Sequence, residues 1–417
     1  MAEIESVVIV GGGQAGSQAA QSLRKRGYEG AISLICEEAY PPYQRPPLSK
    51  AYLKGELDED RLYFRPASYY DENNIDLRLG ARAETIDRGA REVRLSDGAM
   101  ITYDRLVIAT GSRPRTIPLP GADLKGVMTL RGVDDAKALR DAAAGAASAA
   151  VIGGGYIGLE AASALRAMGL SVHVFERMPR LLARVTSPIV SDFYRGFHKE
   201  KGAEIHCESD ITHLVGENGA LSGIALSDGT TVPAQIALIG IGVLPNQELA
   251  AEAGLDCEDG VVVNESCQTS DPLIYAAGDC CRRTVAGYPG TVRLESVHNA
   301  LEQGERIAAH IAGQDVPATD TPWFWSDQYN VKLQTVGLFN DYTDTVIRGD
   351  QDAAKFSVFY YKGDALVAID AINDPATFMA GRQIFKFGAP LSKEDAQNAD
   401  VALKDIVKAH KAKSAGA

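Results

Sequence analysis

The sequence predicts an α/β protein in which two modules of one type are followed by a third, α+β domain. Three observations support this fold class. Residues 4–35 and 149–175 each read as a short apolar strand, a glycine-rich turn, a helix and a second strand, which is the βαβ pattern. The two segments share the spacing of their glycines. After residue 322 the pattern changes to short strands joined by a hairpin turn.

The first module begins with the apolar run 4–10, which predicts a strand. Gly11, Gly13 and Gly16 follow it in a G-x-G-x-x-G turn, and apolar residues then recur at helical spacing. In such a turn the first glycine permits the bend, the second lets the backbone approach a diphosphate, and the third lets the helix pack closely on the strand. Free N–H groups at the helix N-terminus favour negative charge. Glu37 ends the next strand, placed to accept hydrogen bonds from a ribose.

The second module repeats this pattern with Gly153, Gly155, Gly158 and, after its second strand, Glu176. A carboxylate ~4 Å from a 2′-phosphate costs about 4 kcal/mol at an effective dielectric of 20. Solvent screening reduces this to about 1–2 kcal/mol. We therefore expect this site to prefer NADH over NADPH, although the neighbouring Arg177 can soften the preference.

Two further strands end at residues suited to a flavin. The run 273–278 ends in Gly278-Asp279, where a carboxylate can accept hydrogen bonds from a polyhydroxyl chain such as the ribityl of a flavin. The run 106–111 ends in Thr110-Gly111 and reaches the same cofactor. Two dinucleotide sites in one chain indicate two cofactors that exchange electrons, FAD in the first and NADH in the second.

The remaining elements complete the predicted layout. The Ala-rich stretch 142–150 predicts a helix end that leads into the second module, and the run 236–242 predicts a buried strand ending in glycine. In the last domain we expect strands over 331–339, 356–361 and 366–369, a hairpin turn at Lys362-Gly363-Asp364, a helix over 376–385, and a Lys-rich, frayed helix over 404–417.

Composition limits the class of protein. The chain has 417 residues, of which 45% are apolar and 23% charged, as in ordinary globular proteins. Its net charge of −13 makes nucleic acid or an anionic membrane a poor partner, so we expect no nucleic-acid binding. No apolar stretch reaches the ~20 residues of a membrane helix, so we expect no membrane insertion. The acidic N-terminus does not read as a secretory signal.

The six cysteines are scattered and form no C-x-x-C or C-x-x-x-x-C pair. This excludes a zinc ribbon and a redox dithiol loop. The adjacent Cys280 and Cys281 are expected to be structural, because adjacent cysteines close a strained ring and buried thiols are usually inert. We expect a cytoplasmic protein with reduced thiols.

Taken together, the motifs resemble those of the FAD- and NADH-dependent ferredoxin reductases of bacterial oxygenase systems. The resemblance runs nearly end to end and lies in the segments Gly11–Gly16, Arg45–Lys50, Ala109–Gly111, Gly153–Glu160, Gly278–Asp279 and Trp323–Gln328, in this order. It implies a glutathione-reductase-like arrangement of two Rossmann-like dinucleotide-binding domains with a C-terminal α+β domain. The implied domains are a discontinuous FAD-binding domain (1–118 and 246–321), an NAD-binding domain (119–245) and the C-terminal domain (322–417).

The resemblance also implies which residues contact the cofactors. For FAD these are Gly11, Gly13, Ala15, Gly16, Glu37, Lys50, Ala83, Thr110, Gly111, Arg131, Asp279 and Val297. For NAD they are Gly153, Gly155, Tyr156, Ile157, Gly158, Glu176 and Gly242.

Four residues are candidates for a direct part in the reaction. We expect Lys50 near the flavin ring, where a cation favours the negative charge of reduced flavin, and Glu160 paired with it and receiving the nicotinamide amide. Tyr156 is expected to cover the nicotinamide pocket, and Trp325 to mark where electrons leave. The alternatives are a structural ion pair, a packed aromatic ring and a core tryptophan.

The partner implied by the resemblance is a 2Fe-2S ferredoxin. Because such ferredoxins are acidic, we expect a local basic patch to bind one. The candidates are Arg65, Arg282, Arg283, Arg293, Arg306, Lys332 and the terminal lysines. Two alternatives stay open: a rubredoxin reductase, and a redox-sensing FAD/NADH interaction module similar to apoptosis-inducing factor.

Overall fold

The computed structural model describes residues 4–285, 288–339 and 341–415, which fold into two compact units. Unit 1 comprises Met1–Arg45, Asp58–Arg113 and Val243–Asp320, and unit 2 comprises Pro46–Leu57, Pro114–Gly242 and Thr321–Ala417. Unit 2 therefore joins the second module to the C-terminal region and also includes residues 46–57. The three-domain division with its predicted boundaries stays a prediction.

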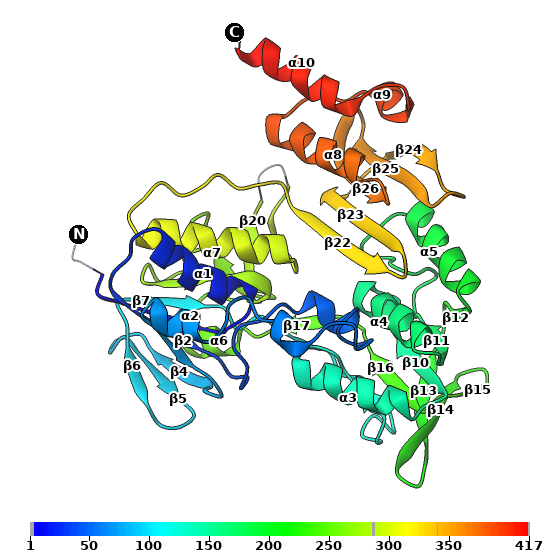
Figure 1. Cartoon of the computed structure of the whole chain (residues 1–417), viewed down its shortest axis with the longest axis horizontal. Helices are drawn as coiled ribbons and strands as arrows, with labels where there is room; N and C mark the ends of the chain where they lie inside the picture. The colour runs from blue at the N-terminus through cyan, green and yellow to red at the C-terminus, as the bar shows by residue number, and fades with distance from the viewer. Residues whose placement is uncertain (1–3, 286–287, 340, 416–417) are drawn as a thin grey trace. The chain divides into compact units, whose positions relative to one another are not determined.

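Unit 1 is built on a parallel sheet in the order β19-β7-β1-β2-β3. Two of its strands, β7 and β2, are labelled in Figure 1. Its helices are α1 (Gln14–Lys25), α2 (Ser68–Glu72), α6 (Glu248–Glu252) and α7 (Val297–Ile311), with the 3-10 turns η2 (Glu59–Arg61) and η3 (Gly278–Cys280). Its strands are β1 (Ser6–Val10), β2 (Ala31–Ile35), β3 (Ile75–Arg78), β4 (Ala83–Asp87), β5 (Glu92–Leu95), β6 (Met100–Thr102), β7 (Arg105–Ile108), β8 (Ser112–Pro114), β17 (Val243–Pro245), β18 (Val261–Val263), β19 (Ile274–Ala276), β20 (Cys281–Thr284) and β21 (Thr291–Val292).

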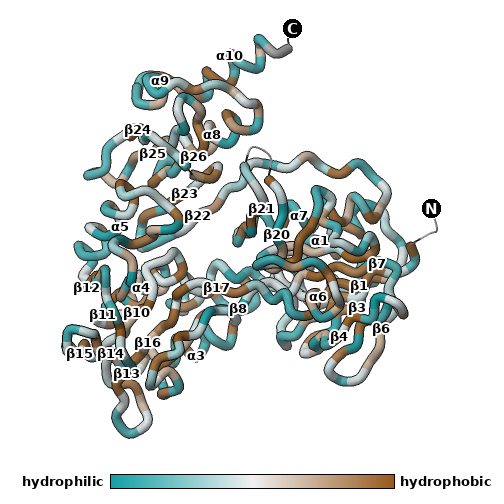
Figure 2. The backbone as a smooth tube through the Cα atoms, turned by 180° about the vertical axis from the view of Figure 1, so that it is seen from behind, coloured by the Kyte–Doolittle hydropathy of each residue, from teal (hydrophilic) through white to brown (hydrophobic). Residues whose placement is uncertain are grey.

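The strands of this sheet are buried on both faces. In β1, Val7 and Ile9 belong to the core under α1 and α7, whereas Val8 and Val10 belong to the opposite core, which includes residues of the antiparallel β4-β5-β6 meander. This follows from the two-residue period of a strand. Such strands read as continuous apolar runs, and β1 and β7 are accordingly brown in Figure 2. The strand β1 was predicted from this continuous apolar run, residues 4–10.

Unit 2 contains a second parallel sheet in the order β12-β11-β10-β16-β9. Its helices are α3 (Val133–Ala144), α4 (Tyr156–Ala167), α5 (Pro188–Glu200), α8 (Pro375–Phe387), α9 (Lys393–Gln397) and α10 (Leu403–Ala415), with the 3-10 turn η1 (Pro46–Ser49). Its strands are β9 (Val127–Met128), β10 (Ser148–Ile152), β11 (Ser171–Phe175), β12 (Ala203–His206), β13 (Ile211–Glu217), β14 (Ala220–Leu226), β15 (Thr231–Pro233), β16 (Ile236–Ile239), β22 (Trp323–Gln328), β23 (Val331–Gly337), β24 (Asp344–Asp350), β25 (Lys355–Lys362) and β26 (Ala365–Ile372).

The last strands of unit 2 form an antiparallel sheet in the order β22-β23-β26-β25-β24. One face is apolar and packs against α8 and α10, with Phe359, Ile369 and Phe378 in its core. The other face is partly polar: buried Asp370 accepts hydrogen bonds from Thr186 (2.5 Å) and from two hydroxyls of neighbouring strands. Burial raises the pKa of the Asp370 carboxyl.

Most predicted elements are present. The hairpin turn at Lys362-Gly363-Asp364 joins β25 to β26, and Gly363 has a φ of 61°. The terminal helix is observed to residue 415, and residues 416–417 of that prediction lie outside the described part. Elements that the sequence did not predict include β22, β24, the β4-β5-β6 and β13-β14-β15 strands and the helices α5 and α7. Short amphipathic strands without a continuous apolar run give a weak periodic signal. Among the described helices, none has the length and apolar composition needed to cross a membrane.

Candidate functional site

The first glycine turn, in unit 1, has the geometry of a dinucleotide cradle. Gly11 has a φ of 113°, and a Cβ there would overlap the carbonyl oxygen of Ala109. A Cβ on Gly16 would overlap the carbonyl oxygen of Gly11, so the helix packs directly on the turn. Around Gly13, in contrast, a Cβ would meet nothing within 4 Å. The middle glycine therefore faces open space. A diphosphate can approach the backbone here because no side chain is in the way.

The second glycine turn, in unit 2, repeats this geometry. Gly153 has a φ of 114°, and a Cβ there would overlap the carbonyl oxygen of Gly240. A Cβ on Gly158 would overlap Gly153, and one on Gly155 would meet nothing within 4 Å. Gly242, with a φ of 102°, ends the chain segment that follows β16.

Both turns lead into helix N-termini that suit an anion. The N-cap residues, Gly13 of α1 and Gly155 of α4, provide no side chain to cap the first N–H groups, and neither helix has an acidic residue in its first turn. The first N–H groups and the helix dipole are therefore available to a phosphate. Ile157, in the first turn of α4, is 45% exposed. The donor sets fit the diphosphates of FAD and of a nicotinamide dinucleotide.

The two acidic residues that follow the second strands differ in their surroundings. Glu37 is 70% exposed and lies 3.5 Å from Arg82. Glu176 is held by its own module, because its carboxylate accepts hydrogen bonds from the backbone N–H groups of Gly154 (2.7 Å) and Met178 (2.8 Å). A carboxylate can accept about four hydrogen bonds, so both retain capacity for ribose hydroxyls.

The other FAD residues predicted in unit 1 lie at the ends of β7 and β19 or at helix and strand starts. Asp279, in η3, accepts a hydrogen bond from Ser112 Oγ (2.9 Å). Thr110 Oγ1 donates to the carbonyl of Asn246 (2.6 Å), and Gly111 has a φ of 68°. The remaining three are Ala15 at the start of α1, Ala83 at the start of β4 and Val297 at the start of α7. A Cβ on Gly278 would lie 3.2 Å from Ala15 Cβ, so η3 reaches the first turn of α1.

Two residues predicted to contact FAD lie in unit 2. The backbone N–H of Arg131 donates to Asp135 Oδ2 (2.8 Å) just before α3. Lys50 follows η1 in the segment 46–57. Their contacts with FAD stay predictions.

Within unit 2, Glu160 is a buried carboxylate with three side-chain donors. It lies on α4 and is only 5% exposed. Its Oε2 accepts from Lys50 Nζ (2.5 Å) and Ser49 Oγ (2.7 Å), and its Oε1 accepts from Ser326 Oγ (2.6 Å). The expected ion pair between Lys50 and Glu160 is therefore present. The ammonium and the two hydroxyls offset the cost of burying the charge and fix the carboxylate in one orientation.

The hydrogen bonds continue from Glu160 into the C-terminal sheet. Ser326 accepts from Gln328 Nε2 (3.2 Å), and Gln328 Oε1 pairs with His198 Nε2 of α5 (2.8 Å). Burial lowers the pKa of His198 and favours its neutral form. Sequence reasoning missed Ser49, Ser326, Gln328 and His198 as partners. The available signal was the two-residue alternation of 324, 326 and 328, which places all three on one face of β22.

The two aromatic candidates lie on opposite sides of β22. Tyr156 packs against Phe324, with ring centroids 4.6 Å apart, and its hydroxyl donates to the carbonyl of Val185 (3.2 Å). Trp325 points the other way and pairs with Trp323 at 5.7 Å. The packed-aromatic alternative for Tyr156 thus has visible contacts, and the roles of Tyr156 and Trp325 in the reaction stay predictions.

The structure corrects two of the docking candidates. Arg283 and Arg306 are each only 4% exposed, so neither guanidinium can reach a partner. Arg283 pairs with Glu302 (2.9 Å), and Arg306 Nε donates to the carbonyl of Glu265 (3.0 Å). The sequence alone does not show whether an arginine is bound by acceptors inside the protein.

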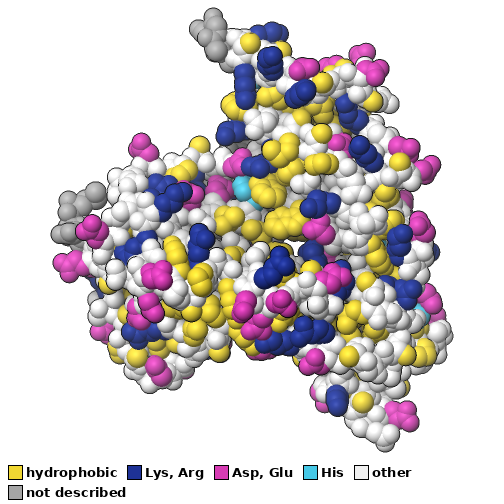
Figure 3. Space-filling view, in the orientation of Figure 1, with side chains coloured by type: hydrophobic (Ala, Val, Ile, Leu, Met, Phe, Trp, Pro, Cys, Tyr) yellow, Lys and Arg dark blue, Asp and Glu magenta, His cyan; other side chains and the backbone are white. Residues whose placement is uncertain are grey.

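The other docking candidates differ in exposure. Arg282 and Arg293 are 23% and 11% exposed and both lie near Asp259, which neutralises part of their charge. Arg65 is exposed, as is Lys332, which is 55% exposed and 3.6 Å from Asp327. The described lysines of the terminal helix are exposed as well, and dark blue side chains mark this helix in Figure 3.

The adjacent cysteines have the surroundings expected of structural thiols. Cys280 and Cys281 are at most 2% exposed, and burial raises the pKa of both thiols. A thiol kept protonated in this way is a poor nucleophile. Both side chains bond to nearby carbonyl oxygens.

These two cradles define a class of protein: an oxidoreductase that holds a flavin dinucleotide and a nicotinamide dinucleotide on one chain. The sequence profile of the pyridine nucleotide-disulphide oxidoreductase family matches residues 5–304, and a reductase C-terminal profile matches residues 323–407. The chain belongs to the pyridine nucleotide-disulphide oxidoreductase family. It is therefore an enzyme that uses FAD and NAD(P)H.

Three relatives share nearly the whole chain. Rhodocoxin reductase of Rhodococcus erythropolis is 42% identical over 406 residues, covering 97% of this chain and 95% of that protein. The crystal structure of a ferredoxin reductase from Rhodopseudomonas palustris has a TM-score of 0.94 at 41% identity, covering 97% of this chain and 100% of that one. The covalent putidaredoxin reductase–putidaredoxin complex has a TM-score of 0.94 at 41% identity, covering 98% and 99%. The resemblance to ferredoxin reductases and the predicted fold class are confirmed.

Proposed function

We propose that this enzyme carries electrons from NADH through FAD to a 2Fe-2S ferredoxin that feeds a bacterial haem monooxygenase or Rieske-type oxygenase. The observation that carries the proposal is the repeated cradle, with Gly13 and Gly155 each facing open space before an uncapped helix. The relatives that share nearly its full length support the acceptor, since they include a reductase in complex with putidaredoxin. When bound, FAD would supply the chemistry that accepts a hydride from NADH and passes on single electrons.

The residues of the chain bind and orient rather than react. The N–H groups that begin α1 and α4 would hold the two diphosphates, and Glu37 and Glu176 would accept hydrogen bonds from the ribose hydroxyls. Glu160, fixed by three donors, presents a carboxylate of defined orientation to the carboxamide of the nicotinamide. This chemistry needs positioning and electrostatics, with no nucleophile or acid–base pair.

The function is tested by following cytochrome c reduction by NADH with and without a 2Fe-2S ferredoxin. We expect strong dependence on the ferredoxin, and a ferredoxin KM that rises with ionic strength because salt screens the docking charges. The expected contributors are exposed cations such as Arg65 and Lys332. The buried Arg283 and Arg306 are not among them.

The same assay separates the alternatives. Equal rates with and without ferredoxin would contradict the proposal and favour a redox-sensing interaction module, and a higher rate with rubredoxin would favour a rubredoxin reductase. A ferredoxin KM that does not change with salt would contradict docking through cations. A cytoplasmic location is part of the proposal, supported by the six cysteines, which are all free.

The preference for NADH over NADPH is expected to depend on Glu176. Its carboxylate is fixed by Gly154 and Met178 and cannot swing away from an incoming 2′-phosphate. In Glu176→Ala we expect the kcat/KM ratio of NADH to NADPH to fall by about tenfold, which corresponds to the 1–2 kcal/mol of screened repulsion. Steady-state kinetics with both dinucleotides measure this ratio.

The control for this prediction is Glu208→Ala, which removes an exposed carboxylate from the same unit. We expect the control to keep the wild-type ratio. A wild-type enzyme that favours NADPH, or a Glu176→Ala variant with an unchanged ratio, contradicts the assignment.

A further inference from the structure

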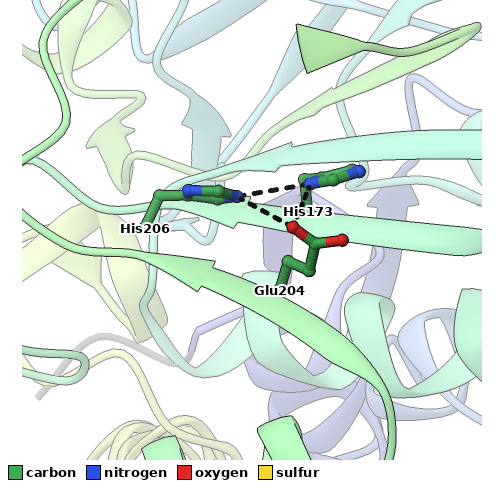
Figure 4. Close-up of side chains that lie close together, drawn as sticks. All are labelled: His173, Glu204 and His206. Atoms are coloured by element: carbon green, nitrogen blue, oxygen red, sulfur yellow. Dashed lines mark hydrogen bonds and ion pairs between the residues drawn. The ribbon is translucent and has the colours of Figure 1, made fainter.

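Three side chains outside the two cradles converge at the edge of the parallel sheet of unit 2. His173 lies on β11, and Glu204 and His206 lie on the neighbouring edge strand β12 (Figure 4). His173 and Glu204 are direct partners in the parallel register, and His206 is two residues further along the same face. The register therefore brings the three side chains together.

The facing atoms are all possible metal ligands. His173 Nδ1 lies 3.3 Å from His206 Nε2 and 3.5 Å from Glu204 Oε2, and His206 Nε2 lies 4.0 Å from the same oxygen. Tetrahedral zinc, with bonds of about 2.0–2.1 Å to nitrogen and oxygen, holds its ligand atoms about 3.3–3.5 Å apart. Two of the three distances have this value. The third closes with a small rotation of Glu204, whose side chain is 64% exposed and free to move.

The surroundings suit a cation held by two partly buried imidazoles. The two histidine side chains are only 13% and 30% exposed, and His206 stacks on the buried ring of Phe175 at 4.8 Å. Apolar residues around polar metal ligands limit solvent access to the site, and here the stacking on Phe175 also orients the imidazole ring of His206. Burial and His173 lower the pKa of His206, which favours the neutral, ligating form. The carboxylate oxygen of Glu204 lies within 4.0 Å of a nitrogen of each ring, so all three groups point toward one another.

We propose that His173, Glu204 and His206 bind one divalent transition-metal ion, Zn²⁺ being the ion whose geometry fits, and that the ion ties the edge strand β12 to β11. Two imidazoles and one carboxylate favour zinc, copper or nickel over magnesium or calcium. The fourth position is left for water. The site lies next to the second cradle, because the backbone N–H of Glu176 donates to the carbonyl of His206 (2.8 Å), but it uses none of the cradle residues.

The test uses the FAD-loaded enzyme after treatment with a chelator. Zn²⁺ is added in competition with a chromophoric zinc chelator, and we expect one ion per chain with a Kd of about 1 μM or lower. Glu204→Gln and His206→Gln should each weaken binding by about tenfold or more. Because Glu204 is largely exposed, its variant should fold as the wild type does.

The matched control is His213→Gln, which removes an exposed histidine of β13 in the same unit. It should bind Zn²⁺ as the wild type does. As a second measurement, Zn²⁺ should raise the Tm of the wild type and of the control but not of Glu204→Gln, since an ion that binds only the folded state stabilises it. Absence of binding, or equal affinity in Glu204→Gln, His206→Gln and the wild type, would overturn the proposal.

Discussion

A Gly155→Val variant will fold with its FAD in place and lose affinity for NADH by about a hundredfold, or about 2.7 kcal/mol. The backbone of Gly155 is extended, with a φ of −81° and a ψ of 178°, which valine adopts without strain. A Cβ at this position would meet no protein atom within 4 Å. We expect the added side chain to exclude a ligand that approaches the turn, which is where the diphosphate of NADH is expected.

Two comparisons make this result specific to the dinucleotide. Gly196→Val adds the same side chain to an exposed position of α5 where a Cβ also meets nothing within 4 Å, and it should leave the KM for NADH unchanged. Gly158→Val, in contrast, overlaps the carbonyl of Gly153 and should destabilise the unit itself. The measurements are the KM for NADH, the FAD content and the Tm. A Gly155→Val enzyme with a wild-type KM would show that NADH does not use this turn.

The parts of this enzyme that sequence reasoning predicted are those written in local patterns. The spacing of Gly11, Gly13 and Gly16 fixes the turn because each glycine meets, or avoids, atoms within a few residues or on an adjoining strand. The same is true of the apolar runs that became β1 and β10. Because the spacing of the glycines determines the shape of the turn, the two glycine turns could be predicted from the sequence.

What the sequence could not show are contacts that depend on packing between distant segments. Ser326 reaches Glu160 only because β22 lies on α4, and 166 positions separate the two residues. Arg283 and Arg306 read as surface cations, yet internal acceptors bind both. The convergence of His173 with His206 depends on the register between two parallel strands. The apolar pattern fixes which face of a sheet each residue takes, but β11 and β12 are separated by α5, so no tight turn sets their register.

The buried ion pair of unit 2, between Lys50 and Glu160, has more hydrogen-bond donors around its carboxylate than a purely structural ion pair requires. A carboxylate that is 5% exposed normally costs more to bury than one cation returns, and replacing such pairs with apolar residues is often neutral or stabilising. The Glu160 side chain is nevertheless bound by Lys50 and by two serines from different segments, η1 and β22. Such a fixed charge suits a group that must orient a polar substrate atom, as we expect for the nicotinamide amide.

Replacing Lys50 with methionine is therefore expected to slow the reduction of FAD by NADH by about tenfold or more. The variant releases Glu160 from its orientation, and it removes a positive charge that we expect to favour the reduced flavin. Stopped-flow absorbance of the flavin measures this rate. The control is Lys54→Met, which removes a neighbouring lysine that pairs with exposed Glu56 (2.6 Å) and should leave the rate unchanged. If Lys50 and Glu160 act as a unit, the Lys50→Met/Glu160→Gln double variant will be no slower than the slower single variant. The loss of one electrostatic contact is expected to slow the reaction about tenfold. If the Lys50→Met rate is instead within about twofold of the wild type, Lys50 does not assist the hydride transfer. Its pair with Glu160 is then a structural one.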